Sequence, residues 1–356
     1  MRLQGVPAFV SIAAQHDNLG DIEIRRELLH WLMIEGVSLR VYVGDMPDSY
    51  INAFGSLRDV MLLKSGLQFQ LELIRQASRV PVLLAFAPGP QIVQRGLRSN
   101  AKLVLNTVNA RYVQRKGGAV VSAGRSFRHV DPSRTSLHLI RRFVKSFNFL
   151  SVRDRASLLV VGSRVRVGPD LAFAGLPETV DPSRVFRRIA FSFRYDFSPD
   201  PSQFASAARH LREADIDTVL VSQVGRDDEV HRMLSEASGV RLVAWGDRGH
   251  AEQEHRVRSE YSTCSVVVSN RLHALLLGAQ AGATPVIVSD GRDKLSETLA
   301  PWLSLAQVPL SLDGVEWADI VQATIDKAEI ANSRRAAVDL RESMVSVAAQ
   351  MVRGSE

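Results

Sequence analysis

Residues 266–288 read VVVSNRLHALLLGAQAGATPVIV, and this stretch predicts a strand, a tight turn, a helix and a second strand. The β-branched runs at its two ends are typical of strands buried in a parallel sheet. Between them, the residues from Leu272 to Ala279 are apolar nearly all round, which is the pattern of a helix inside a domain. Ser269 or Asn270 can cap the start of that helix, and Gly282 can end it.

Two polar residues interrupt this apolar unit, Arg271 and His273, and both fall in the first helical turn. In a parallel α/β sheet that turn lies at the carboxyl edge of the strands, where ligands bind. Free backbone N–H groups and the helix dipole favour an anion there, so the pair predicts an anion site with Ser269 and Asn270 beside it. The alternative is that Arg271 forms a salt bridge with a neighbour and that His273 is a hydrogen-bonded core histidine.

The alternation of strand and helix runs through the whole chain. It fades over residues 175–183, which predicts a linker, and resumes with the strand-like segment from Ile189. We therefore expect an α/β protein with two doubly wound, Rossmann-like domains facing across a cleft. The predicted domains are residues 1–176 and 187–330, followed by a C-terminal helix at 331–356 that packs back on the first domain.

Composition excludes several classes of protein. The 356 residues are 46% hydrophobic and 23% charged, as in globular proteins, and no run reaches the roughly 18 apolar residues of a membrane span. The N-terminus has no apolar signal-peptide core, and the single cysteine, Cys264, excludes an intrachain disulfide. We therefore expect a cytoplasmic protein. No histidine pair has a zinc-binding spacing and Cys264 is alone, so we expect no obligatory metal. We also expect no cofactor.

A net charge of +6 points to anionic partners, although arginines scattered along the whole chain are the simpler explanation. Nucleic acid is not expected, because the chain has no zinc finger, no RNP-like motif and no dense basic tail. The segment 134–147 predicts a helix with an apolar stripe and a basic face formed by Arg134, Arg141, Arg142 and Lys145. Such a helix could lie on the anionic inner face of the cell membrane, or it could be an ordinary packed helix with a solvated face.

Polar residues follow several other predicted strands. Asn18 and Gly20 suit a turn that needs positive φ, and Asp21 suits the N-cap of the next helix. The turn is neither a G-x-G-x-x-G fingerprint nor a P-loop, which argues against nicotinamide and ATP. Other predicted strands also end in residues suited to a site at the same edge of the sheet, and we expect a loop at each of these ends. The residues are Gly89 in Ala87-Pro88-Gly89-Pro90, Arg125 in Gly124-Arg125-Ser126, Arg153, Asp170 and Arg194.

Taken together, these segments resemble the polysaccharide pyruvyl transferase family. The most specific block is Ser269-Asn270-Arg271-Leu272-His273-Ala274 with Ala281-Gly282-Ala283-Thr284-Pro285, although Gly278 stands where the family has Ala. The other segments are similar to family motifs in the same order along the chain: Asn18-Leu19-Gly20-Asp21, Ser151-Val152-Arg153-Asp154, Gly168-Pro169-Asp170 and Asp290 to Lys294.

The resemblance implies a glycosyltransferase-B-like fold. It also implies transfer of a pyruvyl group from phosphoenolpyruvate to two hydroxyls of one sugar, which forms a cyclic ketal. The acceptor would be a cell-surface polysaccharide repeat, in many cases while still lipid-linked. Phosphoenolpyruvate is then the donor substrate, and the second domain is the donor side.

Phosphoenolpyruvate needs cationic groups for its carboxylate and its phosphate, and arginine suits both because its fork matches planar oxyanions. We expect Arg271 and Arg153 to bind the donor, with Lys294 as a point charge on the phosphate. His273 could transfer a proton, either as acid or as base. Asp21 or Asp170 could act as the base for a hydroxyl or orient His273. Acceptor-binding candidates are Asn18, Gly20, Gly89, Arg125 and Arg194.

Two other classes of function remain open from the sequence. One is a nucleotide-sugar-dependent glycosyltransferase or epimerase of the same two-domain shape, in which Arg271 and Lys294 would hold a diphosphate. The other is a non-catalytic subunit of a polysaccharide assembly complex, basic enough to lie on a membrane. The oligomeric state and the acceptor sugar do not follow from the sequence.

Overall fold

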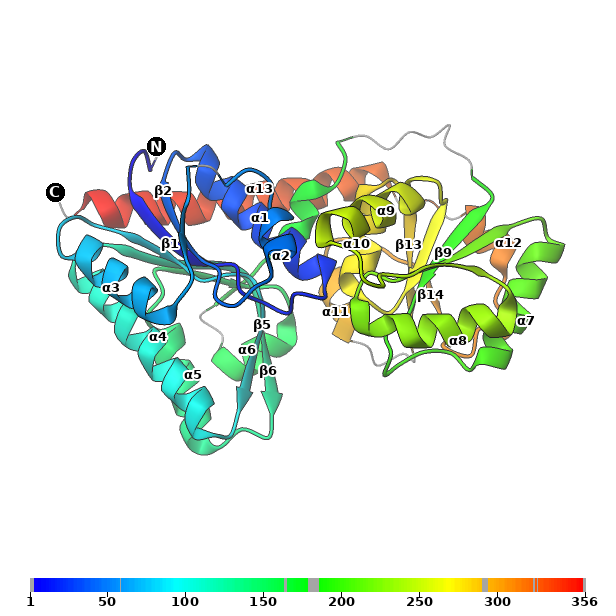
Figure 1. The fold of residues 1–356 in the computed structure, drawn as a ribbon, viewed down its shortest axis with the longest axis horizontal. Helices are drawn as coiled ribbons and strands as arrows, with labels where there is room; N and C mark the ends of the chain where they lie inside the picture. Colours follow the sequence, from blue (N-terminus) through cyan, green and yellow to red (C-terminus); the bar gives the residue numbers. More distant parts are fainter. Residues whose placement is uncertain are drawn as a thin grey trace. The chain divides into compact units, whose positions relative to one another are not determined.

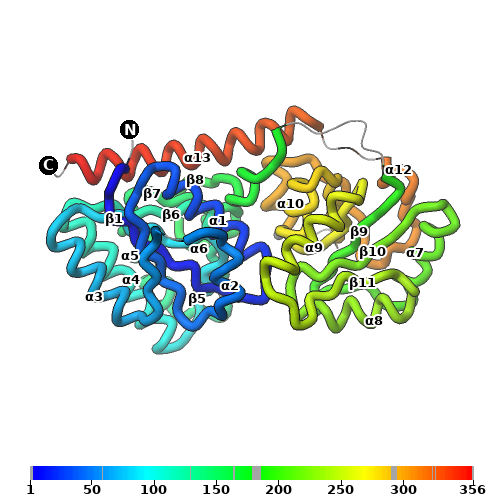
Figure 2. The backbone as a smooth tube through the Cα atoms, turned by 45° about the horizontal axis from the view of Figure 1, so that its top comes forward, coloured from blue at the N-terminus to red at the C-terminus, as the bar shows by residue number. Residues whose placement is uncertain are grey.

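The computed structural model describes residues 3–57, 59–162, 165–178, 186–289, 294–322, 324 and 326–354, with backbone only for His129 and Lys294 (Figures 1 and 2). The chain forms two compact units. The first unit comprises Met1–Ala14, Asp21–Leu171 and Ala336–Glu356. The second comprises Gln15–Gly20 and Ala172–Arg335, so the short segment Gln15–Gly20, which lies in the predicted first domain, groups with the second unit.

The first unit is built on a parallel sheet with the strand order β3-β2-β1-β4-β6-β7-β8, in which β5 pairs with the distal half of β6. Every pairing in this sheet is parallel, so the carboxyl ends of all its strands meet at one edge. The strands are β1 (Pro7–Ser11), β2 (Ser38–Tyr42), β3 (Met61–Leu63), β4 (Leu83–Ala85), β5 (Gly89–Gln94), β6 (Ala119–Val130), β7 (Phe149–Val152) and β8 (Arg166–Val167).

Helices cover both faces of this sheet. On one face α3, α4 and α5 lie side by side, as both views show (Figures 1 and 2). Their inner residues Leu73, Ala110 and Val113 pack on Phe9 and Val120 of the strands. The helices are α1 (Leu19–Ile34), α2 (Asp48–Asn52), α3 (Gly66–Ala77), α4 (Leu97–Arg115), α5 (Arg134–Val144), α6 (Arg155–Val161) and the C-terminal part of α13 (Lys327–Arg353).

Two predicted loops are strands in the structure. The expected loop after β4 continues as β5 from Gly89, and the expected loop at Arg125 lies inside β6. The two segments pair in parallel, with Gly89 opposite Arg125. The prediction was wrong because Pro88 and Pro90 look like loop residues, whereas Pro is tolerated at the start of an edge strand such as β5.

The second unit holds a parallel sheet with the order β11-β10-β9-β12-β13-β14. Its strands are β9 (Arg188–Ser192), β10 (Asp217–Val221), β11 (Arg241–Val243), β12 (Val266–Ser269), β13 (Thr284–Val288) and β14 (Gln307–Val308). Its helices are η1 (Leu171–Gly175), α7 (Pro201–Glu213), η2 (Gly225–Asp227), α8 (Asp228–Ser238), α9 (His250–Ser262), α10 (Leu272–Gln280), α11 (Lys294–Leu299) and α12 (Trp317–Gln322).

Both sheets have the doubly wound order, in which the chain reverses direction across the sheet at a switch point. The switch points lie between β1 and β4 and between β9 and β12. The predicted α/β class with two parallel, Rossmann-like sheets is confirmed, and ligands in such sheets bind at the carboxyl ends beside the switch point. Among the described helices, none is long and apolar enough to cross a membrane.

A buried histidine braces the carboxyl edge of the second sheet. The Nε2 atom of His231 accepts a hydrogen bond from the backbone N–H of Phe193 (2.8 Å), so the neutral ring carries its proton on Nδ1, 2.8 Å from the Ser222 hydroxyl. The side-chain amide of Gln253 donates to the carbonyl of Ser222 (2.9 Å). Burial lowers the pKa of His231 to about 4, because the charged imidazolium would be cut off from water.

The first prediction concerns Gly278, in the helix of the opening stretch. A Cβ at this position would lie 2.6 Å from Cγ2 and 2.9 Å from Cβ of Val267. Val267 is a stiff, fully buried side chain in β12, so Gly278→Ala should lower the free energy of unfolding by about 1–2 kcal/mol despite alanine's better helix propensity. In a Val267→Ala background the loss should shrink by at least half. Urea denaturation measures both, and equal losses in the two backgrounds would contradict this packing argument.

The second prediction concerns His231. Its pKa in the folded protein lies below the ordinary value of 6.5, so the unfolded chain binds a proton that the folded protein does not. The contribution of the neutral ring to stability is therefore complete above about pH 6.5 and is lost as the pH falls toward 4, by up to about 3 kcal/mol. The difference in unfolding free energy between wild type and His231→Gln should narrow over this interval. A difference independent of pH in urea titrations would refute the assignment.

Candidate site at the switch point of the second sheet

The turn after β12 is fixed by Ser269 and Asn270. The Ser269 hydroxyl donates to the carbonyl of Ser192 (2.6 Å) and accepts from the backbone N–H of Arg271 (2.9 Å). The Asn270 carboxamide accepts from the backbone N–H of Arg194 (2.9 Å) and donates to the carbonyl of Phe197. Neither side chain caps α10, whose N-cap residue is Arg271. These bonds join the ends of β9 and β12 across the switch point.

Arg271 forms an ion pair with Asp227, the last residue of η2. The Nε and Nη2 groups of Arg271 donate to the two carboxylate oxygens of Asp227, which is fully buried and also accepts from the backbone N–H of Tyr195 (3.1 Å). Burial raises the pKa of the Asp227 carboxyl, while the hydrogen bonds from Arg271 act in the opposite direction. Within the described part of the chain, Nη1 of Arg271 has no hydrogen-bond partner, so one edge of the guanidinium is available to an anion.

His273 lies against Gly20, which is 253 positions earlier in the chain. A Cβ at Gly20 would fall 2.1 Å from Nδ1 and 2.4 Å from Cβ of His273, so only glycine fits there. The expected reason for glycine was wrong: the backbone angle φ is positive at neither Asn18 nor Gly20, and Gly20 belongs to α1. Glycine is needed because a helix start and a histidine side chain approach each other closely.

The segment Gln15–Gly20 is attached to the end of β10 by hydrogen bonds. The Asn18 side-chain oxygen accepts from the backbone N–H of Gly20 (3.0 Å) and from the side-chain amide of Gln223 (3.0 Å). The backbone N–H of Gly225 donates to the carbonyl of Asp17 (2.8 Å), and Asp17 pairs with Arg226 (3.4 Å). Two predicted acceptor residues, Asn18 and Gly20, therefore lie beside the predicted donor residues of the second unit.

Another candidate of this unit, Arg194, follows β9 and is half-exposed. It forms a bidentate ion pair with Asp196, in which Nε (2.9 Å) and Nη2 (2.6 Å) each donate to one carboxylate oxygen. This pair lowers the pKa of Asp196, with a smaller contribution from the charge of Arg271. Arg194 is thus at the same switch point as Arg271.

In the first unit, Asp21 is not the N-cap that its sequence position suggests. Helix α1 begins at Leu19, which places Asp21 in its first turn. A carboxylate there still interacts favourably with the positive end of the helix dipole. Its Oδ1 accepts from Nη1 of Arg25 (2.8 Å), and the pair is buried. A Cβ at Gly89, where φ is +103°, would lie 3.6 Å from Oδ1 of Asp21 and 3.7 Å from Nη2 of Arg25. Gly89 and Asp21 are therefore neighbours.

Arg125 is a buried cation beside this pair. Its Nη2 group donates to the side-chain oxygen of Gln91 (2.9 Å), and its guanidinium lies 5.6–6.0 Å from the ring centroids of Phe86, Phe127 and Phe143. Burial, helped by the charge of Arg25, lowers the pKa of Arg125 to about 10. The Arg125 guanidinium thus lies against aromatic rings, which attract a cation through their negative faces.

Arg153 and Asp170 contact each other directly. Arg153 follows β7, Asp170 follows β8, and Nη1 of Arg153 donates to Oδ2 of Asp170 in a pair that is almost completely buried. The neighbouring Asp154 caps α6 by accepting from the backbone N–H of Ser157 (2.8 Å). The structure thus brings together two residues that the sequence assigned to donor binding and to proton transfer.

The expected phosphate contact, Lys294, lies in a segment that the structure describes only in part. Lys294 is the first residue of α11, but its side chain and residues 290–293 lie outside the described residues. Among the residues that the structure does describe, no group of three His, Cys, Asp or Glu could hold a metal ion.

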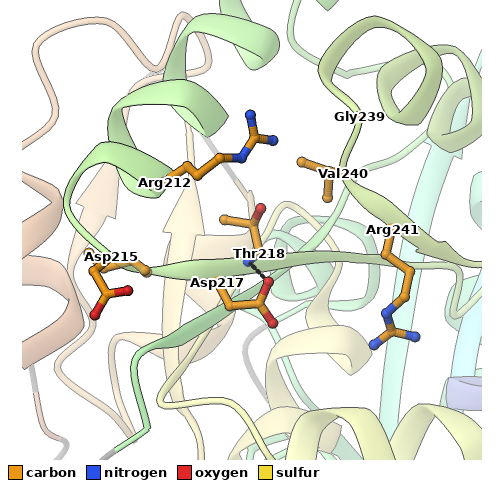
Figure 3. A pocket seen from close by; sticks show the side chains of 8 residues that line it. Arg212, Asp215, Asp217, Thr218, Gly239, Val240 and Arg241 are labelled. Carbon is orange, nitrogen blue, oxygen red and sulfur yellow. Dashed lines mark hydrogen bonds between the residues drawn. The ribbon is translucent and has the colours of Figure 1, made fainter.

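A separate cavity of about 380 Å³ lies at the opposite edge of the second sheet (Figure 3). Arg212 and Arg241 are among the residues that line it, together with Asp217 and Thr218 at the start of β10. Arg241 is paired with Glu260 (2.6 Å) and Asp217 with Arg188 (2.9 Å). Because parallel sheets bind ligands at the carboxyl ends of their strands, this amino-terminal cavity is a weaker candidate than the switch point.

Sequence reasoning missed Asp227, Gln223 and Arg25. Gln223 is the second residue after β10, as Arg194 is the second residue after β9, so its position at a strand end was a usable signal. Asp227 and Arg25 gave no comparable signal, because their importance comes from contacts with Arg271 and Asp21.

Solved structures with the same fold include enzymes of nucleotide-sugar chemistry. One is a putative UDP-N-acetylglucosamine 2-epimerase from Listeria monocytogenes (TM-score 0.59, 11% identity, 99% of this chain and 98% of that chain). Another is the UDP-GlcNAc 2-epimerase of Neisseria meningitidis (TM-score 0.55, 9% identity, 95% of this chain and 100% of that chain). A third is HepE of Anabaena, in complex with UDP and glucose (TM-score 0.51, 12% identity, 98% of this chain and 99% of that chain). At these identities the likeness shows the fold alone, which agrees with the expected glycosyltransferase-B-like class.

The sequence itself is more informative about the family. Comparison with curated proteins gives no match. The sequence profile of the polysaccharide pyruvyl transferases, in contrast, matches residues 18–291, which include the Asn18 turn, Arg153, Asp170 and the Arg271–His273 block. The match covers the bulk of the chain and includes residues of both units. The chain therefore belongs to the polysaccharide pyruvyl transferase family.

Proposed function

We propose that the protein transfers the pyruvyl group of phosphoenolpyruvate to two hydroxyls of one sugar, on a cell-surface polysaccharide or its lipid-linked precursor. In the proposed reaction the methylene carbon gains a proton and the first hydroxyl oxygen attacks C2. Phosphate leaves with the C2–O bond electrons, and the second hydroxyl closes the ketal. One hydroxyl proton balances the proton on the methyl group, and the other leaves with phosphate. The observation that carries the proposal is the pairing of a carboxylate-held Arg271 with His273 at the start of α10.

The donor would bind at the N-terminus of α10. Its trianion would meet the open Nη1 edge of Arg271, free N–H groups of the first helical turn and the positive end of the helix dipole. Asp227 supports this role because it holds the guanidinium through Nε and Nη2 and leaves Nη1 without a hydrogen-bond partner among the described residues. We assign Lys294 to the phosphate as a point charge, and Ser269 and Asn270 to building the turn that presents Arg271.

His273 would move the proton. Its contact with Gly20 restricts the ring, which is what a proton-transfer group requires. As an acid it would serve the methylene carbon, and as a base the attacking hydroxyl. The pH dependence of kcat/KM separates the two roles, because an acid is active below its pKa and a base above it.

The acceptor would contact the polar residues around the two switch points. In the second unit these are Asn18, Gly20 and Arg194; in the first unit they are Gly89 and Arg125. The Arg153–Asp170 pair supplies a buried carboxylate whose charge is balanced, and Asp21 is balanced by Arg25. We propose Asp21 and Asp170 as the carboxylates that accept a hydroxyl proton or orient the histidine, and Arg153 as a second contact for the donor.

The third prediction tests the donor. Incubation with ¹⁴C-phosphoenolpyruvate and a lipid-linked or polysaccharide acceptor should give labelled, acid-labile ketal and inorganic phosphate. His273→Asn should lower kcat at least about a hundredfold, the size typical of a lost proton-transfer group. Arg271→Lys should raise KM for the donor while keeping the charge opposite Asp227, so that loss of folding does not confuse the result. Label transfer from a UDP-sugar instead, with no phosphate from phosphoenolpyruvate, would sink the proposal.

The fourth prediction tests the contact at Gly20. Gly20→Ala should displace the His273 ring and lower kcat at least about tenfold, because the new Cβ would lie 2.1 Å from Nδ1. The matched control is Gly66→Ala at the start of α3, where a Cβ would meet nothing within 4 Å. Rates are compared at equal folded fraction, measured by circular dichroism. Full activity of Gly20→Ala would show that His273 needs no fixed position.

A further inference from the structure

Helices α3 and α4 each carry apolar residues on an exposed side as well as on the side that packs into the core. The inner face of α3 packs Leu73 and Ala77 into the core, and the inner face of α4 packs Leu103, Ala110 and Val113. A surface helix needs one apolar stripe, so a second stripe facing outward calls for an explanation.

The outward stripes are strongly exposed. On α3, Leu67, Leu71 and Ile74 are 69%, 59% and 50% exposed at helical spacing. On α4 the exposed apolar residues are Leu97 (91% exposed), Val104 (45%), Leu105 (47%) and Val108 (56%). We call these residues of α3 and α4 together the outer apolar face.

The two helices form one continuous surface. Both pack on the same part of the core, and the hydroxyl of Tyr112 in α4 lies 3.5 Å from the carbonyl of Ile74 in α3. Both views show α3 and α4 side by side, with α5 next to α4 (Figures 1 and 2). The side chain of Ser136 in α5 donates to that of Asn100 in α4 (3.0 Å).

The surroundings of this face are basic on the side of α4 and α5. All four charged residues of α4 are cations, namely Arg98, Lys102, Arg111 and Arg115. Helix α5 also has no acidic residue, and its Arg141 and Arg142 are exposed. From residue 97 to residue 145 the chain has eleven Lys and Arg, of which Arg125 is buried, and one acidic residue, Asp131.

We propose that the outer apolar face is a docking surface for an anionic phospholipid bilayer. Aliphatic side chains flanked by Arg and Lys suit an interface in which the apolar groups enter the acyl boundary and the cations meet headgroup phosphates. A second copy of this chain is a poorer occupant, because a symmetric contact would bring the cations of both α4 helices together.

This surface differs from the one expected from the sequence. The apolar stripe of α5 is used inside the protein, where Ile140 and Phe143 are fully buried in a core cluster with Phe127. Only the basic side of α5 remains for the membrane. Its cations add to the charge around the outer apolar face, while α3 and α4 supply the apolar contact.

The fifth prediction tests this surface with the full chain and vesicles, without any assay of transfer. The protein should co-sediment with vesicles of 30% phosphatidylserine in phosphatidylcholine and much less with pure phosphatidylcholine. Leu71→Ser/Val108→Ser should lower the partition coefficient at least about tenfold, because binding scales with buried apolar area. Lys102→Gln/Arg115→Gln should weaken binding in dilute salt and flatten its salt dependence. The control is Met233→Ser, 52% exposed on α8 of the second unit, which should bind like wild type.

Three outcomes would overturn the membrane assignment. One is equal partitioning of wild type to anionic and neutral vesicles. Another is unchanged binding by Leu71→Ser/Val108→Ser when its circular dichroism matches wild type. The third is a concentration-dependent dimer in sedimentation velocity that this double variant abolishes, which would assign the face to a second copy. None of these results depends on the donor substrate, so they are independent of the proposed pyruvyl transfer.

Discussion

The second unit depends on the ion pair between Asp227 and Arg271. A fully buried carboxylate is tolerated only when its lone pairs are satisfied, and here two N–H groups of the Arg271 guanidinium and the backbone N–H of Tyr195 do so. Removing one partner of such a pair leaves an uncompensated charge and typically costs about 3–5 kcal/mol. The pair links the end of β10 to the end of β12, and Asn270 and Ser269 extend the link to β9. The switch point is therefore one connected polar framework.

This framework fixes the residues of the proposed anion site relative to one another. A guanidinium held along one edge has lost most of its rotational freedom, so binding through the other edge loses little additional entropy. His273 is restrained in a different way, by steric contact with Gly20. A hydrogen-bonded cation and a sterically confined imidazole thus stand two residues apart on the same helix turn.

Much of this arrangement could be predicted from residues 266–288. The apolar pattern identified the buried helix α10. The position of Arg271 and His273 at the start of that helix marked them as candidate site residues. The alternative interpretation of Arg271, a salt bridge to a neighbour, also holds, because Asp227 occupies one edge of the fork. What could not be predicted are contacts between distant segments: the sequence cannot show that Gly20 meets His273 or that Gln223 holds Asn18. It also misread β5, because strand pairing outweighed the local signal of two prolines.

The division of the chain has a consequence for its modularity. The chain leaves the first unit at residue 15, returns at 21, leaves again at 172 and returns at 336. Recombination between related genes could not exchange the second unit as one uninterrupted block, because the exchanged block would lack the residues that contact His273 and Gln223. During synthesis, likewise, Gln15–Gly20 emerges long before the strands that receive it. The second unit therefore depends on two separate stretches of the chain, both when genes recombine and when the protein is synthesised.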